Sequence, residues 1–421
     1  MDVWVAAIAF LITYAVIVSD RVDKTLTALA GGLAMILLRI LDQEDAFDAI
    51  DFNVIFLLAG MMILAGILRR TGFFQWLAIR SIKISDAEPF RLLIVLSVIS
   101  AVLSAVLDNV TTMVLIAPVT ISIASILGIN PVPLLVSEIL ASNIGGTATL
   151  IGDPPNILIG SASGLDFAAF LANMGPVALL VFLVFLVTLR VLFGGKLRVE
   201  PEAREAALAL DEAEVIADPR LLRVSVAVIG ATLVGFLVHG QLGYEPATVA
   251  LIGATVLMLV ARMEPESVLR EIEWPTLFFF VGLFMLVEGV VHVGIIDAMA
   301  TRLFDLTAGD PAVTTLGLLW LSGIASAIID NIPYTATMIP VVQGLGSAGL
   351  PIEPLWWSLA LGACLGGNAT IIGASANVVV ANLSGRSGHP ITFRGFLPYG
   401  VVVVVESLVI ATVYLWLRYL L

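Results

Sequence analysis

The chain has 421 residues, of which 60% are hydrophobic and only 13% are charged, whereas a soluble domain carries about 25% charged residues. Long apolar blocks exclude a membrane β-barrel, in which apolar and polar residues alternate, and a net charge of −13 argues against a nucleic-acid partner. The single cysteine, Cys364, excludes an internal disulfide and a thiolate metal site, so we predict an all-α polytopic membrane protein without metal or cofactor.

The apolar runs predict two similar sets of membrane helices. In the first half, residues 1–196, three spans precede an interfacial helix, a hairpin, a broken helix and a last span. Their predicted ranges are 2–18, 24–40, 53–68, 72–83, 91–127, 132–165 and 175–193. After a polar linker, 197–220, the second half, residues 221–421, repeats this order. Its ranges are 221–239, 245–262, 275–291, 295–305, 312–345, 353–382 and 398–420.

The two halves are copies of one another. A shift of 222 positions places Gly60 on Gly282, and a shift of 221 places Gly145 on Gly366. The arms of each hairpin have about 17 residues, and whether they cross the membrane twice or enter and return, they add an even number of crossings. Each half then crosses an odd number of times in total. The halves therefore have opposite orientations, which predicts an inverted repeat with about 10 transmembrane helices and two re-entrant hairpins.

Basic residues are divided unequally between the two sides of this topology. Of the 20 Lys and Arg, all but Arg39, Arg302 and Arg418 fall on one side, Lys196 and Arg198 among them. The positive-inside rule makes that side cytoplasmic. We therefore predict a multi-pass protein of the cell membrane with both termini extracytoplasmic and a cytoplasmic linker. The linker contains a predicted surface helix that starts at proline.

Polar residues interrupt the hydrophobic runs at corresponding places in the two halves. Such paired interruptions are the best sequence pointer to a transporter's binding site, because non-helical backbone persists at membrane depth only where protein or water surrounds it. Helices restart after each break, and their N-terminal ends favour an anionic or oxygen-rich ligand. We expect Asp153 to cap one of them, with Pro154 at its first position. The candidate substrate- and ion-binding residues are Asp108, Asn109, Thr111, Thr112, Gly145, Gly146, Thr147, Thr149, Asp153, Asn156, Asp330, Asn331, Thr335, Gly366, Gly367, Asn368, Thr370, Ser375 and Asn377.

Asp108 and Asp330 are the candidate proton carriers. A carboxylate at membrane depth is a functional hypothesis by default, and burial favours its protonated form. We expect neither residue to have a basic partner in the apolar core. The alternative is that each Asp caps a hairpin arm and faces water. Glu288, which has no acidic counterpart in the other half, is a secondary candidate for a proton path.

These motifs resemble the ion transporter superfamily along nearly the whole chain. The run from Asp108 to Thr112 is similar to the Ser-Asn-Thr hairpin tip of the divalent anion/sodium symporters, with Asp in place of Ser. The run from Ser142 to Asn156 is closer to the branch that holds the arsenical pump membrane protein (ArsB) and the melanocyte P protein. The resemblance implies a scaffold domain, which includes the first three spans and is often dimeric, and a transport domain that moves as an elevator.

The resemblance also implies a function, namely arsenite and antimonite efflux driven by inward H⁺ movement, in some members with a separate ATPase subunit. Neutral arsenite suits hydroxyl, amide and carbonyl partners, and Asp at the hairpin tip favours H⁺ over Na⁺. Cys364 alone cannot form a three-thiolate arsenic site, so we expect it to serve packing. The second loop lacks the paired prolines of the first, so the two half-sites are unequal.

Other functions remain open at this stage. The main alternative is a sodium- or proton-coupled carrier of a carboxylate or another small anion. A passive channel and an intramembrane aspartyl hydrolase are weaker readings, since the Gly-x-Gly-Asp signature of such hydrolases is absent. The chain carries no P-loop motif, so it does not hydrolyse ATP by that route. We therefore predict a secondary transporter rather than an enzyme.

Overall fold

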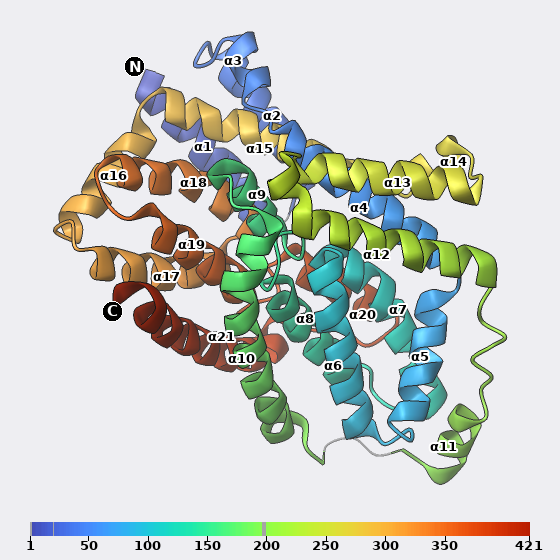
Figure 1. The fold of residues 1–421 in the computed structure, drawn as a ribbon. Coiled ribbons are helices and arrows are strands. Elements are labelled where there is room, and N and C mark those ends of the chain that lie inside the picture. Colours follow the sequence, from blue (N-terminus) through green and yellow to red (C-terminus); the bar gives the residue numbers. More distant parts are fainter. Residues whose placement is uncertain (1, 20, 196–198) are drawn as a thin grey trace.

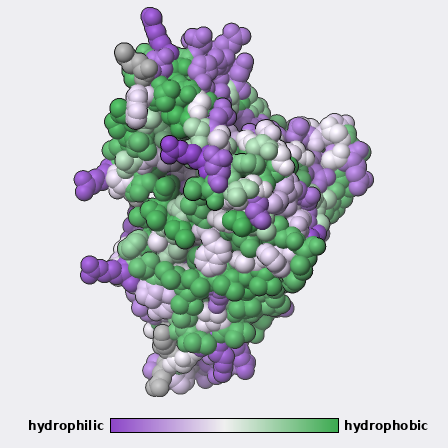
Figure 2. All heavy atoms as spheres, turned by 90° about the vertical axis from the view of Figure 1, so that its left-hand side faces the viewer, coloured by the Kyte–Doolittle hydropathy of each residue, from purple (hydrophilic) through white to green (hydrophobic). Residues whose placement is uncertain are grey.

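The computed structural model describes residues 2–19, 21–195 and 199–421, and all regular structure within these ranges is helical. Among the described residues, nine helices are long and apolar enough to cross a membrane. Figure 2 shows apolar side chains over much of one face, with hydrophilic ones gathered mainly at its upper and lower ends. Lys196, Arg198 and the start of the linker at 197–198 lie outside the described residues. The prediction of an all-α polytopic membrane protein is confirmed.

The predicted helices occur in the predicted order in both halves, and each half has one further short helix, between its second and third spans, that was not predicted (Figure 1). The first half comprises α1 (Asp2–Ser19), α2 (Lys24–Leu37), α3 (Gln43–Asp48), α4 (Phe52–Arg70), α5 (Phe73–Ile84), α6 (Pro89–Val106), α7 (Asn109–Leu127), α8 (Val132–Gly146), α9 (Pro154–Ser163) and α10 (Phe167–Phe193). The linker contains α11 (Pro201–Leu208). The second half comprises α12 (Pro219–Leu242), α13 (Pro246–Ala261), α14 (Pro265–Leu269), α15 (Trp274–His292), α16 (Ile295–Leu306), α17 (Pro311–Ile328), α18 (Asn331–Ser347), α19 (Ile352–Gly366), α20 (Ser375–Arg386), α21 (Phe393–Leu415) and a π-helical turn, η1 (Trp416–Leu420).

The helices α1–α4 and α12–α15 form one packed unit, which we call the scaffold group. Within it, α2 packs on α15 and α4 packs on α13. In the repeat, α2 is equivalent to α13 and α4 to α15, so the two contacts are equivalent. A Cβ added at Gly60 would stand 2.9 Å from the Cβ of Ala250, and one added at Gly282 would stand 2.6 Å from the carbonyl oxygen of Ala28. These two contacts are equivalent under the sequence repeat. The halves are therefore related by an approximate two-fold axis.

The helices α6–α10 and α17–α21 form the second unit, which we call the hairpin group. Here α6 packs on α8 and α17 packs on α19, and close approach again depends on glycine. A Cβ at Gly366 would stand 2.7 Å from the Cα of Gly323, and one at Gly145 would overlap the backbone of Ala101. In addition, α9 contacts α18 and α20 contacts α7. The broken helix of each half therefore meets the hairpin of the other half.

Two predicted boundaries are wrong. The spans expected from 175 and 398 begin earlier, as α10 and α21, at Phe167 and Phe393. Each helix starts at a capping side chain, and the internal prolines Pro176 and Pro398 do not end it. Neighbouring helices can partner the backbone groups that a proline frees.

The linker is docked against α5 and against α7 of the hairpin group. Arg204 of α11 pairs with Asp86 in the turn after α5. Glu212 accepts a 3.3 Å hydrogen bond from Arg80 of α5, and the backbone N–H of Ala217 donates to the carbonyl of Thr71 over 2.9 Å. The described part of the linker thus follows the surface of α5 and α7 rather than only spanning the two halves.

Candidate functional site

Each hairpin turns at an aspartate that caps its second arm. The Oδ1 atom of Asp108 accepts a 2.7 Å hydrogen bond from the N–H of Thr111 at the start of α7. The Oδ1 atom of Asp330 accepts a 3.1 Å bond from the N–H of Ile332 at the start of α18. Aspartate suits this position because its carboxylate partners N–H groups that the helix leaves free. Both aspartates therefore cap a hairpin arm, as the alternative expected, but both are buried rather than facing water. Capping leaves Oδ2 of each carboxylate for other partners.

The unwound loops are tied to the hairpins by repeat-equivalent hydrogen bonds. Thr149 donates from Oγ1 to the carbonyl of Ala105 over 2.7 Å, and Thr370 donates to that of Ala327 over the same distance. Each loop is also closed by an asparagine at the start of the following helix. These closing bonds run from Nδ2 of Asn156 to the Thr149 carbonyl and from Nδ2 of Asn377 to the Thr370 carbonyl, both 2.9 Å long.

Asn143, near the end of α8, joins the two halves. Its Oδ1 accepts a 3.1 Å bond from Asn109 of the first hairpin, and its Nδ2 donates to Asn368 and Asn377 of the second half, at 2.9 Å each. All four side chains are buried. The repeat equivalent of Asn143 is Cys364, whose Sγ lies 3.4 Å from Oδ1 of Asn156. Cys364 therefore does more than pack, because its contact mirrors the one from Asn143 to Asn377.

Asp153 does not act as the expected side-chain cap. It occupies the N-cap position of α9, with Pro154 next, but its carboxylate makes no capping hydrogen bond. Instead, Oδ1 accepts a 3.1 Å bond from Nδ2 of Asn331 in the second hairpin. Asp153 is fully buried, and this contact links the two halves. Its carboxylate thus faces the site rather than its own helix.

Asp330 has a basic partner, contrary to the prediction. The Nζ atom of Lys24, at the start of α2 in the scaffold group, lies 2.8 Å from Oδ2 of Asp330. The hydroxyl of Ser375 donates to the same oxygen over 2.6 Å. This pairing could not be predicted from the sequence, because Lys24 lies at the start of a span and its partner is 306 positions away. Asp108, in contrast, makes no salt bridge among the described residues.

A cavity of about 340 Å³ lies where the hairpin tips face the scaffold group. Its scaffold wall includes Lys24, Asp23 and Glu273, and its opposite wall includes Asp108 and Ser375. Apolar side chains of α4, α15 and α20 complete it. The cavity extends to the exposed loop before α2, on the side predicted to be cytoplasmic. The breaks therefore adjoin a space that can hold a small solute.

The remaining predicted residues mostly support the loops. Thr147 donates to the Asn143 carbonyl over 2.8 Å, and Gly146 and Gly367 allow their loops to fold back closely on Gly152 and Gly373. Glu288 is half-buried on α15 and does not line the cavity. Thr111 borders the first hairpin tip. Thr112 and Thr335 are buried, with hydroxyls that have no hydrogen-bond partner within the described part of the chain.

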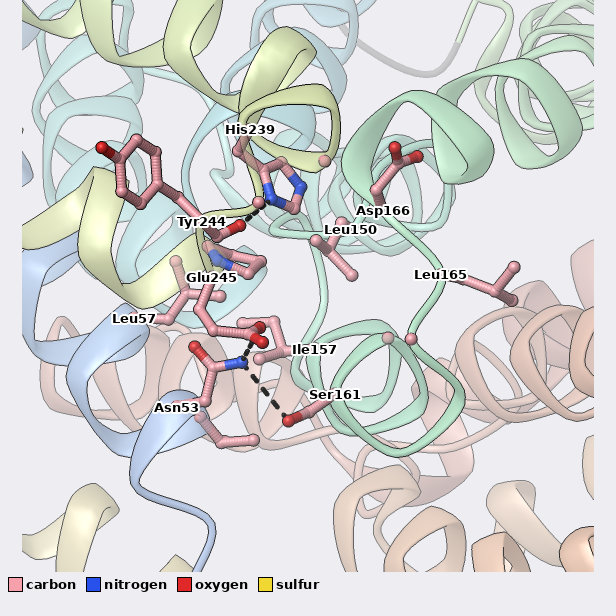
Figure 3. A pocket seen from close by; sticks show the side chains of 16 residues that line it. Asn53, Leu57, Leu150, Ile157, Ser161, Leu165, Asp166, His239, Tyr244 and Glu245 are labelled. Atoms are coloured by element: carbon pink, nitrogen blue, oxygen red, sulfur yellow. Dashed lines mark hydrogen bonds between the residues drawn. The ribbon is translucent and has the colours of Figure 1, made fainter.

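A second cavity, of about 250 Å³, is the repeat counterpart of the first (Figure 3). Asn53 of α4 donates to Glu245 over 2.9 Å, and its Nδ2 also lies 3.5 Å from the hydroxyl of Ser161 on α9. His239 holds the Tyr244 carbonyl through Nδ1, with an N–O distance of 2.7 Å. This cavity lies on the side predicted to be extracytoplasmic, again between the scaffold and hairpin groups.

The family model described as citrate transporter (CitMHS) matches residues 14–362. The chain belongs to this family. A 46 kDa membrane protein of Mycobacterium leprae is 43% identical over 99% of both chains, and an uncharacterized transporter of Mycobacterium tuberculosis is 44% identical over 99% of this chain and 98% of its own. The human P protein is 35% identical over 96% of this chain, which spans 58% of that relative.

The fold has a solved counterpart. The YdaH transporter of Alcanivorax borkumensis matches with a TM-score of 0.63 and 15% identity, covering 94% of this chain and 99% of that one. Together with the family match, this makes the CitMHS chain a multi-pass membrane transporter and confirms the resemblance to the ion transporter superfamily. No group of three or more metal-ligating side chains occurs in the described ranges.

Proposed function

We propose that this CitMHS transporter exports a small oxyacid, arsenite or antimonite, in exchange for H⁺. The observation that carries the proposal is that Asp108, Ser375 and Lys24 line one small cavity, with Lys24 paired to the buried Asp330 beside it. Arsenite at neutral pH is an uncharged trihydroxide that can donate three hydrogen bonds. The carboxylate, hydroxyl and carbonyl oxygens of the hairpin tips and loops supply acceptors for such a solute.

Proton coupling would use the two tip carboxylates. A carboxylate in an apolar membrane setting is costly when charged and can be carried at lower cost when protonated. Asp108 has capping contacts but no salt bridge among the described residues, so its protonation breaks no ion pair. The scaffold group would stay fixed in the cell membrane while the hairpin group carries solute and proton between the two cavities. Both termini would lie outside the cell, and a homodimer or a separate ATPase subunit remains part of the proposal.

A carboxylate carrier is the second candidate. Its support is the description of the matched family as citrate transporter and the presence of Arg21 and Lys24 at the cavity. Both cations belong to the scaffold side of the cavity. A substrate carried by the hairpin group would therefore move away from both cations as that group moves to the second cavity. This favours a solute without strong negative charge. Either Na⁺ or H⁺ would drive this alternative.

The test is arsenite movement in proteoliposomes of the purified full chain. With a pH gradient and no Na⁺, we expect accumulation that Asp108→Asn or Asp330→Asn reduces about tenfold or more, the effect of losing about 1.4 kcal/mol of coupling. Asp48→Asn, an exposed change on α3, is the matched control and should leave transport unchanged. An absence of arsenite flux in vesicles that show citrate counterflow would favour the carboxylate carrier. Unchanged pH dependence in both site variants would refute the role of the carboxylates.

A further inference from the structure

We propose that Lys24 is a fixed positioning residue that competes with the transported proton for Asp330, and that it does so only when the site faces the first cavity. This inference rests on the proposed function and extends it to the order of proton release. It concerns a residue of the scaffold group, whereas the candidate substrate- and ion-binding residues lie in the hairpin group.

The contact itself is specific. Lys24 Nζ and Ser375 Oγ both donate to Oδ2 of Asp330, at 2.8 and 2.6 Å, while Oδ1 is occupied by the backbone of α18. The Asp330 side chain is 2% exposed and that of Lys24 is 21% exposed. A proton on Oδ2 and the ammonium cannot both occupy this oxygen in the observed geometry. The carboxylate is thus paired either with a proton or with Lys24.

The pair also joins two units that must move relative to one another. Lys24 begins α2 in the scaffold group, whereas Asp330 caps α18 at a hairpin tip. Tyr14 of α1 adds a second link to this tip, because its hydroxyl donates to the Pro333 carbonyl over 2.7 Å. Removing one partner of a buried ion pair is far more costly than separating an exposed one. The contact therefore stabilises the state with the first cavity open.

In the sequence repeat, the second cavity has no equivalent of the Lys24 ammonium. The equivalents of Arg21 and Lys24 are Gly243 and Pro246, and both line the second cavity. That cavity has no Lys or Arg among its described lining residues. Its charged or titratable side chains are Asp166, His239, Tyr244 and Glu245. A tip that moves there meets no cation to displace its proton.

Proton release follows from this difference between the cavities. When the protonated tip reaches the first cavity, the proton leaves Oδ2 of Asp330 for water, and the carboxylate pairs with the ammonium of Lys24. Lys24 keeps its own charge throughout and carries nothing across the membrane. Among the described residues, the other charged groups around this place are Arg21 and Asp23 before α2, Glu273 before α15, Asp108 before α7 and Asp153 before α9. All of them remain in the variants proposed below.

The first experiment compares net transport with exchange in proteoliposomes. For Lys24→Gln we expect proton-driven arsenite accumulation to fall about tenfold or more, with its dependence on internal pH flattened, while arsenite–arsenite exchange stays within about twofold of wild type. Lys24→Arg should restore most of the accumulation, because it restores the charge. Lys83→Gln, which removes a partly exposed lysine at the end of α5, is the matched control. Equal loss of exchange and accumulation in Lys24→Gln would overturn the proposal.

The second experiment needs no substrate and therefore separates this inference from the proposed function. Spin labels at Glu44→Cys on α3 and Ala162→Cys on α9, in a Cys364→Ser background, report the distance between the two groups in nanodiscs. In labelled protein that keeps Lys24 and Asp330, we expect high pH to favour one distance between the labels and low pH to broaden the distance distribution. Lys24→Gln, Asp330→Asn and the double variant should all show the broad distribution at both pH values. Distributions identical to the parent protein, or additive effects in the double variant, would overturn the proposal even if no arsenite moves.

Discussion

The polar junction at Asn143 allows a quantitative prediction. Asn143→Ala removes three buried hydrogen bonds, to Asn109, Asn368 and Asn377. Interhelical hydrogen bonds in membrane proteins average about 0.6 kcal/mol, which gives about 2 kcal/mol for the three. If the groups left behind find no new partner, each costs about 1–3 kcal/mol. Asn368 and Asn377 keep the bonds that their Nδ2 atoms donate, but these do not satisfy the freed Oδ1 atoms. We therefore expect a loss of about 2–9 kcal/mol.

The assay is thermal unfolding of the purified protein in detergent. An unfolding entropy of about 2.1 cal/mol/K per residue amounts to about 0.9 kcal/mol/K for this chain, so Tm should fall by about 2–10 °C. Asn143→Cys should lose less than Asn143→Ala, because Cys364 makes the equivalent contact at the equivalent position. Asn382→Ala, which truncates an exposed asparagine on α20, is the control. Equal Tm values for Asn143→Ala and the control would refute the reasoning.

Two further predictions concern close contacts. Gly366→Val should block transport and lower Tm, because its Cβ would stand 2.7 Å from the Gly323 backbone. Gly317→Val, on the open face of α17, is the control and should be tolerated. Transport by both variants at the wild-type rate would contradict the crowding argument. Tyr14→Phe removes two hydrogen bonds to α18, one to the Pro333 carbonyl and one shared with the Thr337 hydroxyl. At about 1 kcal/mol each, their loss should reduce by about fivefold to thirtyfold the preference for the state in which the first cavity is open. Labelling of a cysteine placed at Val378 in this cavity, by a water-soluble maleimide, would then slow, and an unchanged rate would show that Tyr14 does not hold this state.

The sequence predicted the helices and the breaks well, because both depend on local or repeated patterns. The hairpin tips were found from an Asp-Asn pair inside an apolar run, and the loops from glycine clusters at the same spacing in each half. Boundaries failed where a capping residue lies several positions before the apolar run, as Asp166 does for α10. The span predicted from 175 therefore missed the first turns of α10, and the internal Pro176 does not end this helix.

Partners across the halves were much harder to predict. The pairing of Asp153 with Asn331 and of Lys24 with Asp330 joins residues 178 and 306 positions apart. The sequence repeat allows one kind of prediction. A contact between two residues of the same half predicts a contact between their equivalents in the other half. That reasoning applies to the pair formed by Thr149 and Ala105, but it cannot apply to Lys24, whose equivalent is proline.

The difference in charge between the two cavities is the feature that can give transport a direction. Two identical halves would give two cavities with equal affinity for a protonated tip, and nothing in the protein would then distinguish loading from release. The backbone keeps the equivalence, with glycine contacts, loop-closing asparagines and cavities repeated in each half. The charges break it, because Lys24 and Arg21 have uncharged counterparts. Because the two halves share a backbone geometry but differ in charge, one structural change can move the hairpin tip from one cavity to the other. The two cavities then differ in their affinity for the same proton.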